Sequence, residues 1–367
     1  MRLVIRPTEL AGALSVAGHA VPARTTVPIL SSVLLQASAE GALSVTATDL
    51  DLAIRVSLAA VVEEPGDAVL PYRYFFDMVR HMTEPELRVS VDPASFAAVL
   101  ECGRGHYEVN GYDPSSYPGL PAPPTGTGVR VSDDQLRLWT RQTVFAAAAD
   151  MSRPALTGVL WEAASDMLRL VATDGTRLAY REAEAISLGE GRASMVVPAR
   201  AMQQVLRMPS GEREVTVRVG PSHVWFEWQA ALLLCRLLAS PYPDYRQVVP
   251  REYICRARVD RAAFRGACQR AALVSRDGFP VVRLQIEEGR IVVAASSPAV
   301  GRGEEEVQAE VEGTALEIAF NADLLLEGVE AVEGQTLLFA ASGPQSVCLL
   351  RDADSARYCY YVLPLRQ

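Results

Sequence analysis

The chain has 367 residues, of which 49% are hydrophobic and 22% are charged, and its formal net charge is −9. A chain of this length and composition can bury several small cores, so we expect two or three domains. No apolar run reaches 18 residues, which excludes a transmembrane helix. The acidic balance argues against a sequence-specific nucleic-acid binder, since such proteins usually carry a basic domain.

The N-terminal segment MRLVIRPTELAGAL contains Glu9 and other polar residues where a secretion signal needs an uninterrupted apolar segment, so we expect a cytoplasmic protein. The six cysteines show no CxxC spacing and the four histidines show no metal-ligand pattern, which predicts reduced cysteines, no metal site and no cofactor. All 35 basic residues are arginine, and a high-GC coding bias is the simplest explanation.

The middle third of the chain contains the most informative stretch, residues 153–182. It predicts two strands joined by a polar turn at residues 164–166, because residues 167–173 alternate at the period of a pleated sheet. Asp174 and Gly175 tolerate positive φ, so a second tight turn is expected to present the residues around it at the rim of the sheet. No catalytic group lies in this stretch.

The same order of patterns occurs three times along the chain. The hairpin patterns begin at Pro28, Pro154 and Pro280. Segments of helical period begin in VLPYRYFF (residues 69–76), VVPARAM (residues 196–202) and IAFNADLL (residues 318–325). YPGLP (residues 117–121) and YPDYR (residues 242–246) close the first two copies. Three units of roughly 120 residues therefore fill the chain, and we place the domains at residues 1–125, 126–252 and 253–367.

The helical patterns carry arginines at regular spacings. The helix predicted from residue 132 begins with a capping box of Ser132 and Gln135, and its core face is expected to contain Leu136, Trp139 and Thr143. The helix predicted over residues 260–273 has a core face of Phe264, Ala267 and Cys268. The arginine pairs are Arg73 and Arg80, Arg137 and Arg141, Arg200 and Arg207, and Arg261 and Arg265. Such arginines either form solvated helix faces or bind a polyanion.

The threefold repeat, together with ATDGTRLA (residues 172–179), YPDYRQVVP (residues 242–250) and the ending YYVLPLRQ (residues 360–367), resembles the bacterial DNA polymerase III beta subunit family, the sliding clamps. The resemblance spans the whole chain. It implies an α+β fold of three tandem DNA-clamp domains, each with two helices packed on antiparallel sheets, and a head-to-tail homodimer that forms a six-domain ring. The implied function is to encircle duplex DNA and tether the replicative polymerase, with no chemistry of its own.

The helices of such a ring would line its bore. Two helices in each of six domains, about 10 Å across, give a circumference of roughly 120 Å and a bore of roughly 25–30 Å, enough for a duplex and water. Arginines there would meet phosphates without reading bases, so binding would be independent of sequence and sensitive to salt. We assign to DNA binding Arg24, Arg73, Arg80, Arg137, Arg141, Arg200, Arg207, Arg261 and Arg265. The last helix is acidic through Asp323, Glu327 and Glu330, so weak DNA contact is expected there.

The resemblance also implies a pocket that takes a short Gln-Leu-x-Leu-Phe-like peptide from the clamp loader, the polymerase and other partners. The matching residues are Leu156, Thr173, Gly175, Thr176, Arg177, Leu178, Pro243, Val248, Asn321, Leu324, Leu363, Pro364 and Leu365. The chain departs from the family pattern at Thr176, Gln247, Leu324 and Leu363, so the pocket is expected to be reshaped. We expect Leu178 and Leu365 to flank the apolar cleft.

Ring closure would pair the exposed sheet edges of the first and third units, because an unpaired edge is a liability. The resemblance places Tyr107, on a strand that ends the first unit, against Leu273 and Val274 at the end of a helix in the third. The alternative for these residues is an ordinary core position.

The sequence leaves two other classes of function beside the clamp. An enzyme is disfavoured because the sequence has no GxSxG, Walker loop, HExxH or clustered acid pair. The other is a specialised clamp paralogue whose reshaped pocket confers tolerance to a clamp-targeting antibiotic.

Overall fold

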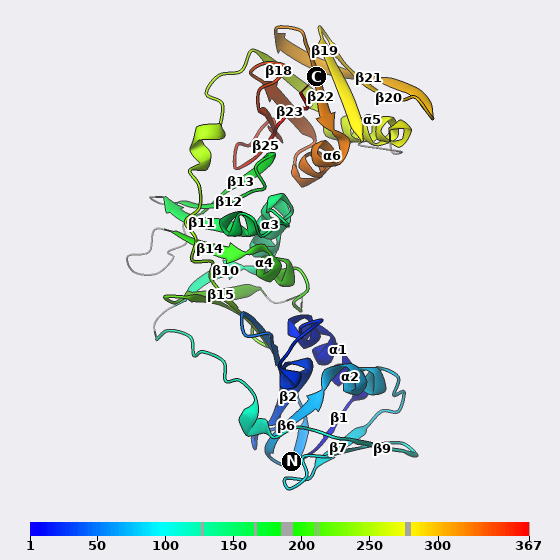
Figure 1. The fold of residues 1–367 in the computed structure, drawn as a ribbon, viewed down its shortest axis with the longest axis vertical. Helices are drawn as coiled ribbons and strands as arrows, with labels where there is room; N and C mark the ends of the chain where they lie inside the picture. The colour runs from blue at the N-terminus through cyan, green and yellow to red at the C-terminus, as the bar shows by residue number, and fades with distance from the viewer. Residues whose placement is uncertain are drawn as a thin grey trace. The chain divides into compact units, whose positions relative to one another are not determined.

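The computed structural model describes residues 1–125, 128–164, 167–184, 194–209, 211, 213–275 and 280–366. It groups into two compact units, one made of Met1–Arg137 and Arg200–Leu237, the other of Leu138–Ala199 and Leu238–Gln367. Each unit consists of antiparallel sheets with helices, which confirms the predicted α+β class (Figure 1). In the described ranges no helix combines the length and the hydropathy that crossing a membrane requires.

The first unit contains two antiparallel sheets. One runs in the order β5 (Val61–Glu64), β1 (Arg2–Ile5), β7 (Leu87–Val91), β8 (Ala98–Cys102) and β9 (Gly105–Val109). The other runs in the order β10 (Val129–Ser132), β15 (Glu214–Val219), β16 (His223–Glu227), β17 (Ala231–Arg236), β4 (Leu52–Ala59), β3 (Ala42–Thr48), β2 (Ser32–Ala37) and β6 (Gly66–Pro71). Helices α1 (Pro7–Ala17) and α2 (Tyr72–Arg80) pack on each other, and α1 packs on β4.

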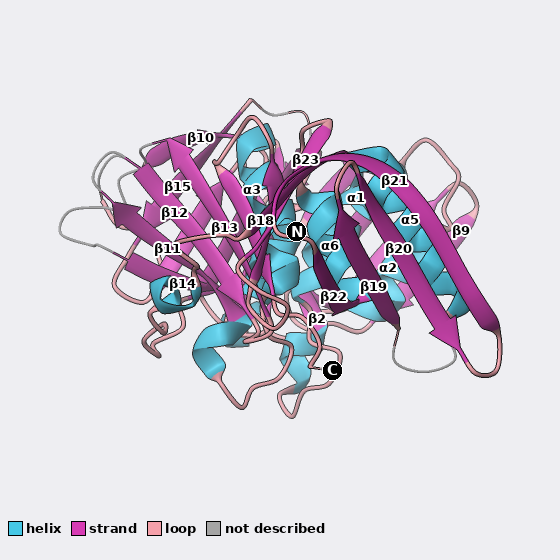
Figure 2. Cartoon of the chain, turned by 90° about the horizontal axis from the view of Figure 1, so that it is seen from above, coloured by secondary structure: helices cyan, strands magenta, loops and turns pink. Residues whose placement is uncertain are grey.

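The second unit contains one long antiparallel sheet. Its first half runs in the order β14 (Ser194–Pro198), β11 (Gly158–Ala164), β12 (Met167–Thr173), β13 (Arg177–Glu184), β25 (Tyr358–Val362) and β24 (Cys348–Asp352). Its second half continues with β23 (Thr336–Ala341), β18 (Cys255–Asp260), β21 (Gly301–Gly313), β20 (Arg290–Ser297), β19 (Val281–Glu287) and β22 (Leu316–Asn321). Helices α5 (Arg261–Val274) and α6 (Ala322–Ala331) contact each other, and α5 packs on β20 and β21 (Figure 2).

The predicted threefold repeat is present as local structure. The hairpins β2–β3, β11–β12 and β19–β20 are followed by the strand and helix pairs β6–α2, β14–α4 and β22–α6, where α4 is Ala199–Val205. Strand β12 confirms the alternation over residues 167–170, where Leu168 and Leu170 are buried and Met167 and Arg169 are partly exposed. Val171 is buried as well, so the predicted alternation does not continue through it. Of the predicted turn at residues 164–166, residues 165 and 166 lie outside the described part of the chain.

The core faces of the helices follow the predicted pattern. In α3 (Asp133–Thr143), Leu136, Trp139 and Thr143 are buried. In α5, Phe264, Ala267 and Cys268 are buried, and the Asp260 side chain accepts the Ala263 N–H at 2.7 Å as an N-cap. All six cysteines are buried and free of disulfides. The apolar periodicity therefore predicted correctly which faces of α3 and α5 are buried.

Candidate functional site

The turn between β12 and β13 is a rigid scaffold. Asp174 Oδ1 accepts the N–H groups of Thr176 at 2.8 Å and Arg177 at 3.1 Å, while Gly175 N–H donates to Thr173 Oγ1 at 3.1 Å. Gly175 has φ of +96°, the left-handed region that favours glycine. The predicted turn is confirmed, and its conformation is fixed by side-chain acceptors within the turn itself.

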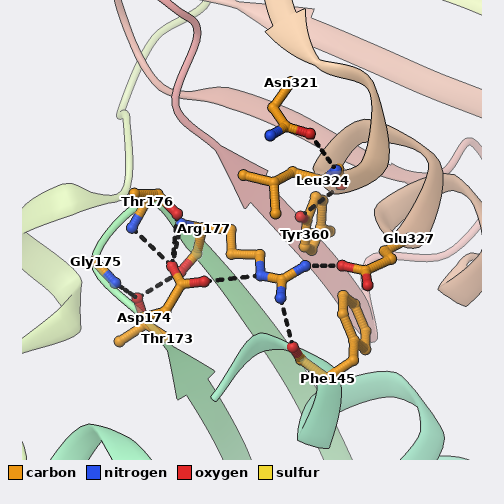
Figure 3. A network of polar contacts seen from close by, with 10 residues as sticks. All are labelled: Phe145, Thr173, Asp174, Gly175, Thr176, Arg177, Asn321, Leu324, Glu327 and Tyr360. Carbon is orange, nitrogen blue, oxygen red and sulfur yellow. Dashed lines mark hydrogen bonds and ion pairs between the residues drawn. The ribbon is translucent and has the colours of Figure 1, made fainter. Parts of the chain in front are cut away.

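Arg177 ties this turn to two other elements (Figure 3). Its guanidinium donates to Asp174 Oδ2 at 3.0 Å and to the Phe145 carbonyl at 2.7 Å, and it forms an ion pair with Glu327 on α6. The guanidinium also lies 5.4 Å from the centroid of the Phe145 ring. Because all three guanidinium nitrogens have partners, Arg177 links the turn to Phe145 and to α6.

The C-terminal segment completes the same surface. Leu363 N–H donates to the Thr176 carbonyl at 2.9 Å, and Leu365 N–H donates to the Ala319 carbonyl at 2.8 Å. On α6, the Asn321 side chain caps the helix by accepting the N–H groups of Asp323 and Leu324. The turn, the C-terminal segment and the start of α6 therefore meet, which brings together predicted pocket residues that are almost 190 positions apart, from 176 to 365.

Tyr360 fixes the position of α6 beneath this surface. Its hydroxyl donates to the Leu324 carbonyl at 2.8 Å, and its ring lies 5.7 Å from that of Phe145. Burial raises the pKa of the Tyr360 hydroxyl, so it stays protonated and keeps donating.

The predicted pocket residues differ strongly in exposure. Val248 and Leu363 are 51% and 41% exposed, which is high for apolar side chains. Leu156 and Leu178 are buried, and Leu178, at 2% exposed, belongs to the core cluster that includes Val171 and Tyr361. The expectation that Leu178 flanks the cleft is therefore corrected: it supports the site from the core, and the exposed apolar surface comes from Val248 and Leu363.

The linker that carries Val248 is pinned to the sheet. Tyr245 is buried and donates its hydroxyl to Glu162 Oε2 at 3.1 Å, and Arg246 pairs with the same oxygen at 2.6 Å. Burial, with a further contribution from Glu162, raises the pKa of Tyr245 to about 12. Gln247 donates to Asp244 at 3.4 Å. These contacts hold the short helical turn Tyr245–Val248 in place, with Val248 and the neighbouring Pro243 exposed.

Sequence reasoning missed several residues that shape this site. Phe145, Glu327 and Tyr360 build its supporting network, and Arg153 lies 3.4 Å from the place where a Gly175 Cβ would stand. Arg153 is the first residue of the informative stretch 153–182, so its place in the sequence was a signal that could have found it. Glu327 was noted only as an acidic residue on the last helix, because its pairing with Arg177 depends on the tertiary fold.

One predicted DNA-binding residue is corrected by the structure. Arg137 is only 9% exposed; its Nε donates to Asp133 Oδ2 at 2.6 Å. Its other two nitrogens donate to backbone carbonyls at 3.0–3.2 Å, those of Leu206, Met208 and Pro209. Asp133 in turn accepts the Trp228 indole N–H at 2.9 Å. With its donors satisfied inside the protein, Arg137 is not available to a phosphate.

The other assigned arginines lie at or near the surface, and several have partners. The paired ones are Arg80 with Asp77, Arg200 with Asp49, Arg207 with His19, Arg261 with the Gly334 carbonyl and Arg265 with Glu330. Arg24, Arg73 and Arg141 are exposed and form no ion pair with another described residue. Helix α4 ends at Val205, so Arg207 lies just beyond the helix on which it was predicted.

The residues predicted for dimerisation are exposed. Tyr107 on β9 is 45% exposed, and Leu273 near the end of α5 is 56% exposed, with Val274 partly exposed. Their exposure disfavours the alternative of a core position, and their contact with a second chain stays a prediction.

Comparison with known proteins covers the chain from end to end. Family models of the DNA polymerase III beta subunit match residues 1–121 with the N-terminal domain, 130–244 with the central domain and 246–366 with the C-terminal domain. The chain is 33% identical to the beta sliding clamp of Synechococcus elongatus, over 100% of this chain and 99% of the relative.

Solved structures of sliding clamps are similar over their full length. The DNA polymerase sliding clamp from Bacillus subtilis has a TM-score of 0.95 at 28% identity, covering 100% of this chain and 99% of that one. A sliding clamp from Bartonella birtlesii bound to griselimycin has a TM-score of 0.93 at 28% identity and covers 100% of both chains. These matches support the predicted three-domain clamp fold and sliding-clamp function, and they do not favour the specialised antibiotic-tolerant paralogue.

Proposed function

We infer that this chain works as a DNA sliding clamp, because it belongs to the DNA polymerase III beta subunit family over nearly its whole length. In our proposal it encircles duplex DNA and tethers the replicative polymerase, and it has no chemistry of its own. We place it in the cytoplasm, where a bacterial chromosome is copied.

The partner-binding part of the proposal rests on one observation: two exposed apolar side chains, Val248 and Leu363, stand on segments that hydrogen bonds hold in place, a side-chain bond from Arg246 beside Val248 and a backbone bond from Leu363. A leucine or phenylalanine from a partner peptide would gain burial against them without ordering the site first. A solved relative is bound to griselimycin, which supports a ligand-accepting surface in this fold. The clamp loader, the polymerase and other proteins with a short clamp-binding peptide are the proposed partners.

The ring proposal is supported by two strand edges. Strand β9 pairs with β8 on one side, and residues 301–308 of β21 pair with β20; within the described residues no other strand pairs with their opposite edges. Arg104 precedes β9 and His106 lies on it, and β21 carries Glu304, Glu305 and Glu306. A head-to-tail dimer would cover both edges.

We propose domains at residues 1–125, 126–252 and 253–367, in keeping with the three family-model segments. The proposed bore contacts are the exposed arginines, with Arg24, Arg73 and Arg141 the most available to phosphate. Reversing the charge at this position with Arg141→Glu should lower the slope of the logarithm of DNA affinity against the logarithm of salt concentration by about 0.9 per lost contact. A slope equal to that of the parent would remove this residue from the DNA-contacting set.

The encirclement mechanism is tested by topology. A nicked circular plasmid, loaded by a clamp loader with ATP, should retain the protein far longer than the same plasmid after linearisation, because a ring without base contacts slides off an open end. Equal retention on both would exclude encirclement. Sedimentation should give a dimer of two 39.7 kDa chains, and a stable monomer at micromolar concentration would contradict the ring.

A further inference from the structure

The first unit contains a second copy of the turn scaffold described above. In the Thr48 turn (residues 48–52), Leu50 N–H donates to Thr48 Oγ1 at 3.0 Å, and Asp49 Oδ1 accepts the N–H groups of Asp51 and Leu52 at 3.1 and 2.8 Å. In the Gly175 turn (residues 173–177), the equivalent bonds measure 3.1, 2.8 and 3.1 Å. In both turns the same three backbone N–H groups donate to the same two side chains, a threonine and an aspartate.

The surroundings of the two turns also correspond. Arg236 N–H donates to the Asp51 carbonyl at 2.8 Å, as Leu363 N–H donates to the Thr176 carbonyl at 2.9 Å. Asp49 pairs with Arg200 at 2.6 Å, as Asp174 pairs with Arg177 at 3.0 Å. Each turn thus has a neighbouring strand end and a guanidinium partner, so the first unit carries the framework of a peptide site.

Two substitutions within this common framework change its surface. The position of Gly175 is occupied by Leu50, which has φ of +82° and is 60% exposed. A left-handed backbone is strained for a branched side chain and free of strain for glycine. The position of Leu363 is occupied by Arg236, whose side chain is 65% exposed. The Thr48 turn therefore has a charged arginine where the Gly175 turn has an apolar leucine, and a leucine side chain where the Gly175 turn has only backbone.

Leu50 lines the small cavity that is left at this turn. Its volume is about 40 Å³, and its walls include Thr48, Ala53, Pro118, Leu120 and Leu234. Ligand pockets ordinarily measure about 300–1,000 Å³. The walls are largely apolar, as a peptide site requires, but the space beside Leu50 does not hold a leucine and a phenylalanine together.

We propose that Leu50 and Arg236 close the N-terminal copy of the peptide site, so that each chain accepts one partner peptide. The Leu50 side chain stands at the mouth where a peptide would pass over Gly175 in the other copy. Arg236, which pairs with Asp51 of the same turn at 3.8 Å and is mostly hydrated, would lose that hydration against an apolar peptide side chain. This inference rests on the peptide-binding function proposed above and adds the residues that confine binding to a single place.

The first test opens the closed copy. The double variant Leu50→Gly with Arg236→Leu is titrated by calorimetry with an acetylated Gln-Leu-Ala-Leu-Phe peptide. We expect the stoichiometry to rise from one to two peptides per chain, with methyl NMR shifts at Leu120 and Leu234. Val61→Gly, at another exposed apolar residue of the same unit, is the matched control and should keep one. A double variant that folds and still binds one peptide overturns the proposal.

The second test closes the open copy. A Cβ at Gly175 would meet its nearest neighbour, Arg153 Nη1, at an ordinary 3.4 Å, and the Thr48 turn shows that leucine fits this hydrogen-bond pattern. Gly175→Leu should therefore keep the parent circular dichroism spectrum while its peptide affinity falls at least tenfold. Unchanged affinity overturns the role assigned to leucine at this position. If the parent chain itself does not bind the peptide, the proposed function fails instead, so the two failures are distinguishable.

Discussion

The side chains of Arg137 and Arg177 are similarly little exposed, at 10% and 11%, and the difference between their surroundings separates stability from binding. Arg137 donates to one buried carboxylate and three backbone carbonyls in the first unit. Arg177 joins a turn, a carbonyl and the exposed Glu327 in the middle of α6 in the second unit. The Arg137 network stays inside the first unit. The Arg177 network includes the turn whose Thr176 carbonyl binds the exposed Leu363.

The comparison shows that the role of a guanidinium with little exposure depends on which groups it binds. The partners of Arg137 are backbone groups that would otherwise be unsatisfied, so its contribution is to folding. The partners of Arg177 belong to separate elements of the candidate peptide site, so its contribution includes the shape of that site. The variants below test this division, from the largest expected effect to the smallest.

Arg137→Ala should have the largest effect on stability. It leaves Asp133, which is 3% exposed, without its cation and strands three carbonyls, so we expect a loss of about 3–5 kcal/mol. Thermal melting, with hydrogen exchange of the β15–β17 amides, measures it. Arg141→Ala on the same helix is the exposed control and should change stability by less than about 0.5 kcal/mol. Equal melting of the two variants would contradict the structural role of Arg137.

Leu363→Asp should abolish peptide binding and leave the fold intact. The side chain is 41% exposed in the free chain, so a carboxylate stays hydrated until a peptide covers it, and desolvation then costs several kcal/mol. Calorimetry should show at least about a hundredfold weaker binding, equal to about 2.8 kcal/mol. Leu178→Asp is the contrast: it places a charge in the core cluster and should unfold the second unit. A stable Leu178→Asp chain would show that our correction is wrong.

Arg177→Ala should moderately lower both stability and peptide affinity. Its side chain is 11% exposed and joins three elements, so we expect about 2 kcal/mol of lost stability, the scale of hydrogen bonds to charged groups. Peptide affinity should fall about tenfold, since α6 loses its tie to the turn. A variant that loses stability but binds peptide like the parent would place Arg177 in the same class as Arg137.

Glu327→Gln should have the smallest effect. The carboxylate is 45% exposed, and ion pairs in water contribute only about 0–1 kcal/mol. The amide still accepts from Arg177, so we expect peptide affinity within about threefold of the parent, an energy change below about 0.7 kcal/mol. A tenfold or greater loss would mean that the charge itself, beyond the hydrogen bond, positions α6.

Local patterns predicted most of the fold. The turn at Asp174 and Gly175, the core faces of α3 and α5 and the three hairpins all depend on residues close together in sequence, and each was found as expected. The candidate site was predicted only in part. Leu178 was expected to flank the cleft because of the family resemblance and its place after the tight turn. Neither shows that other segments, such as the linker at Tyr245, cover its side chain.

The sequence by itself determined the repeat, the α+β class and the family, because these depend on residue types and their spacing, which can be read without a structure. Only the tertiary structure decided which arginines are free and which are buried. Arg137 and Arg141 lie one helical turn apart and look alike in sequence, yet one is enclosed by carbonyls from residues 206–209 and the other is exposed. The physical reason is that hydration of a charge depends on long-range packing, which brings together segments some seventy residues apart.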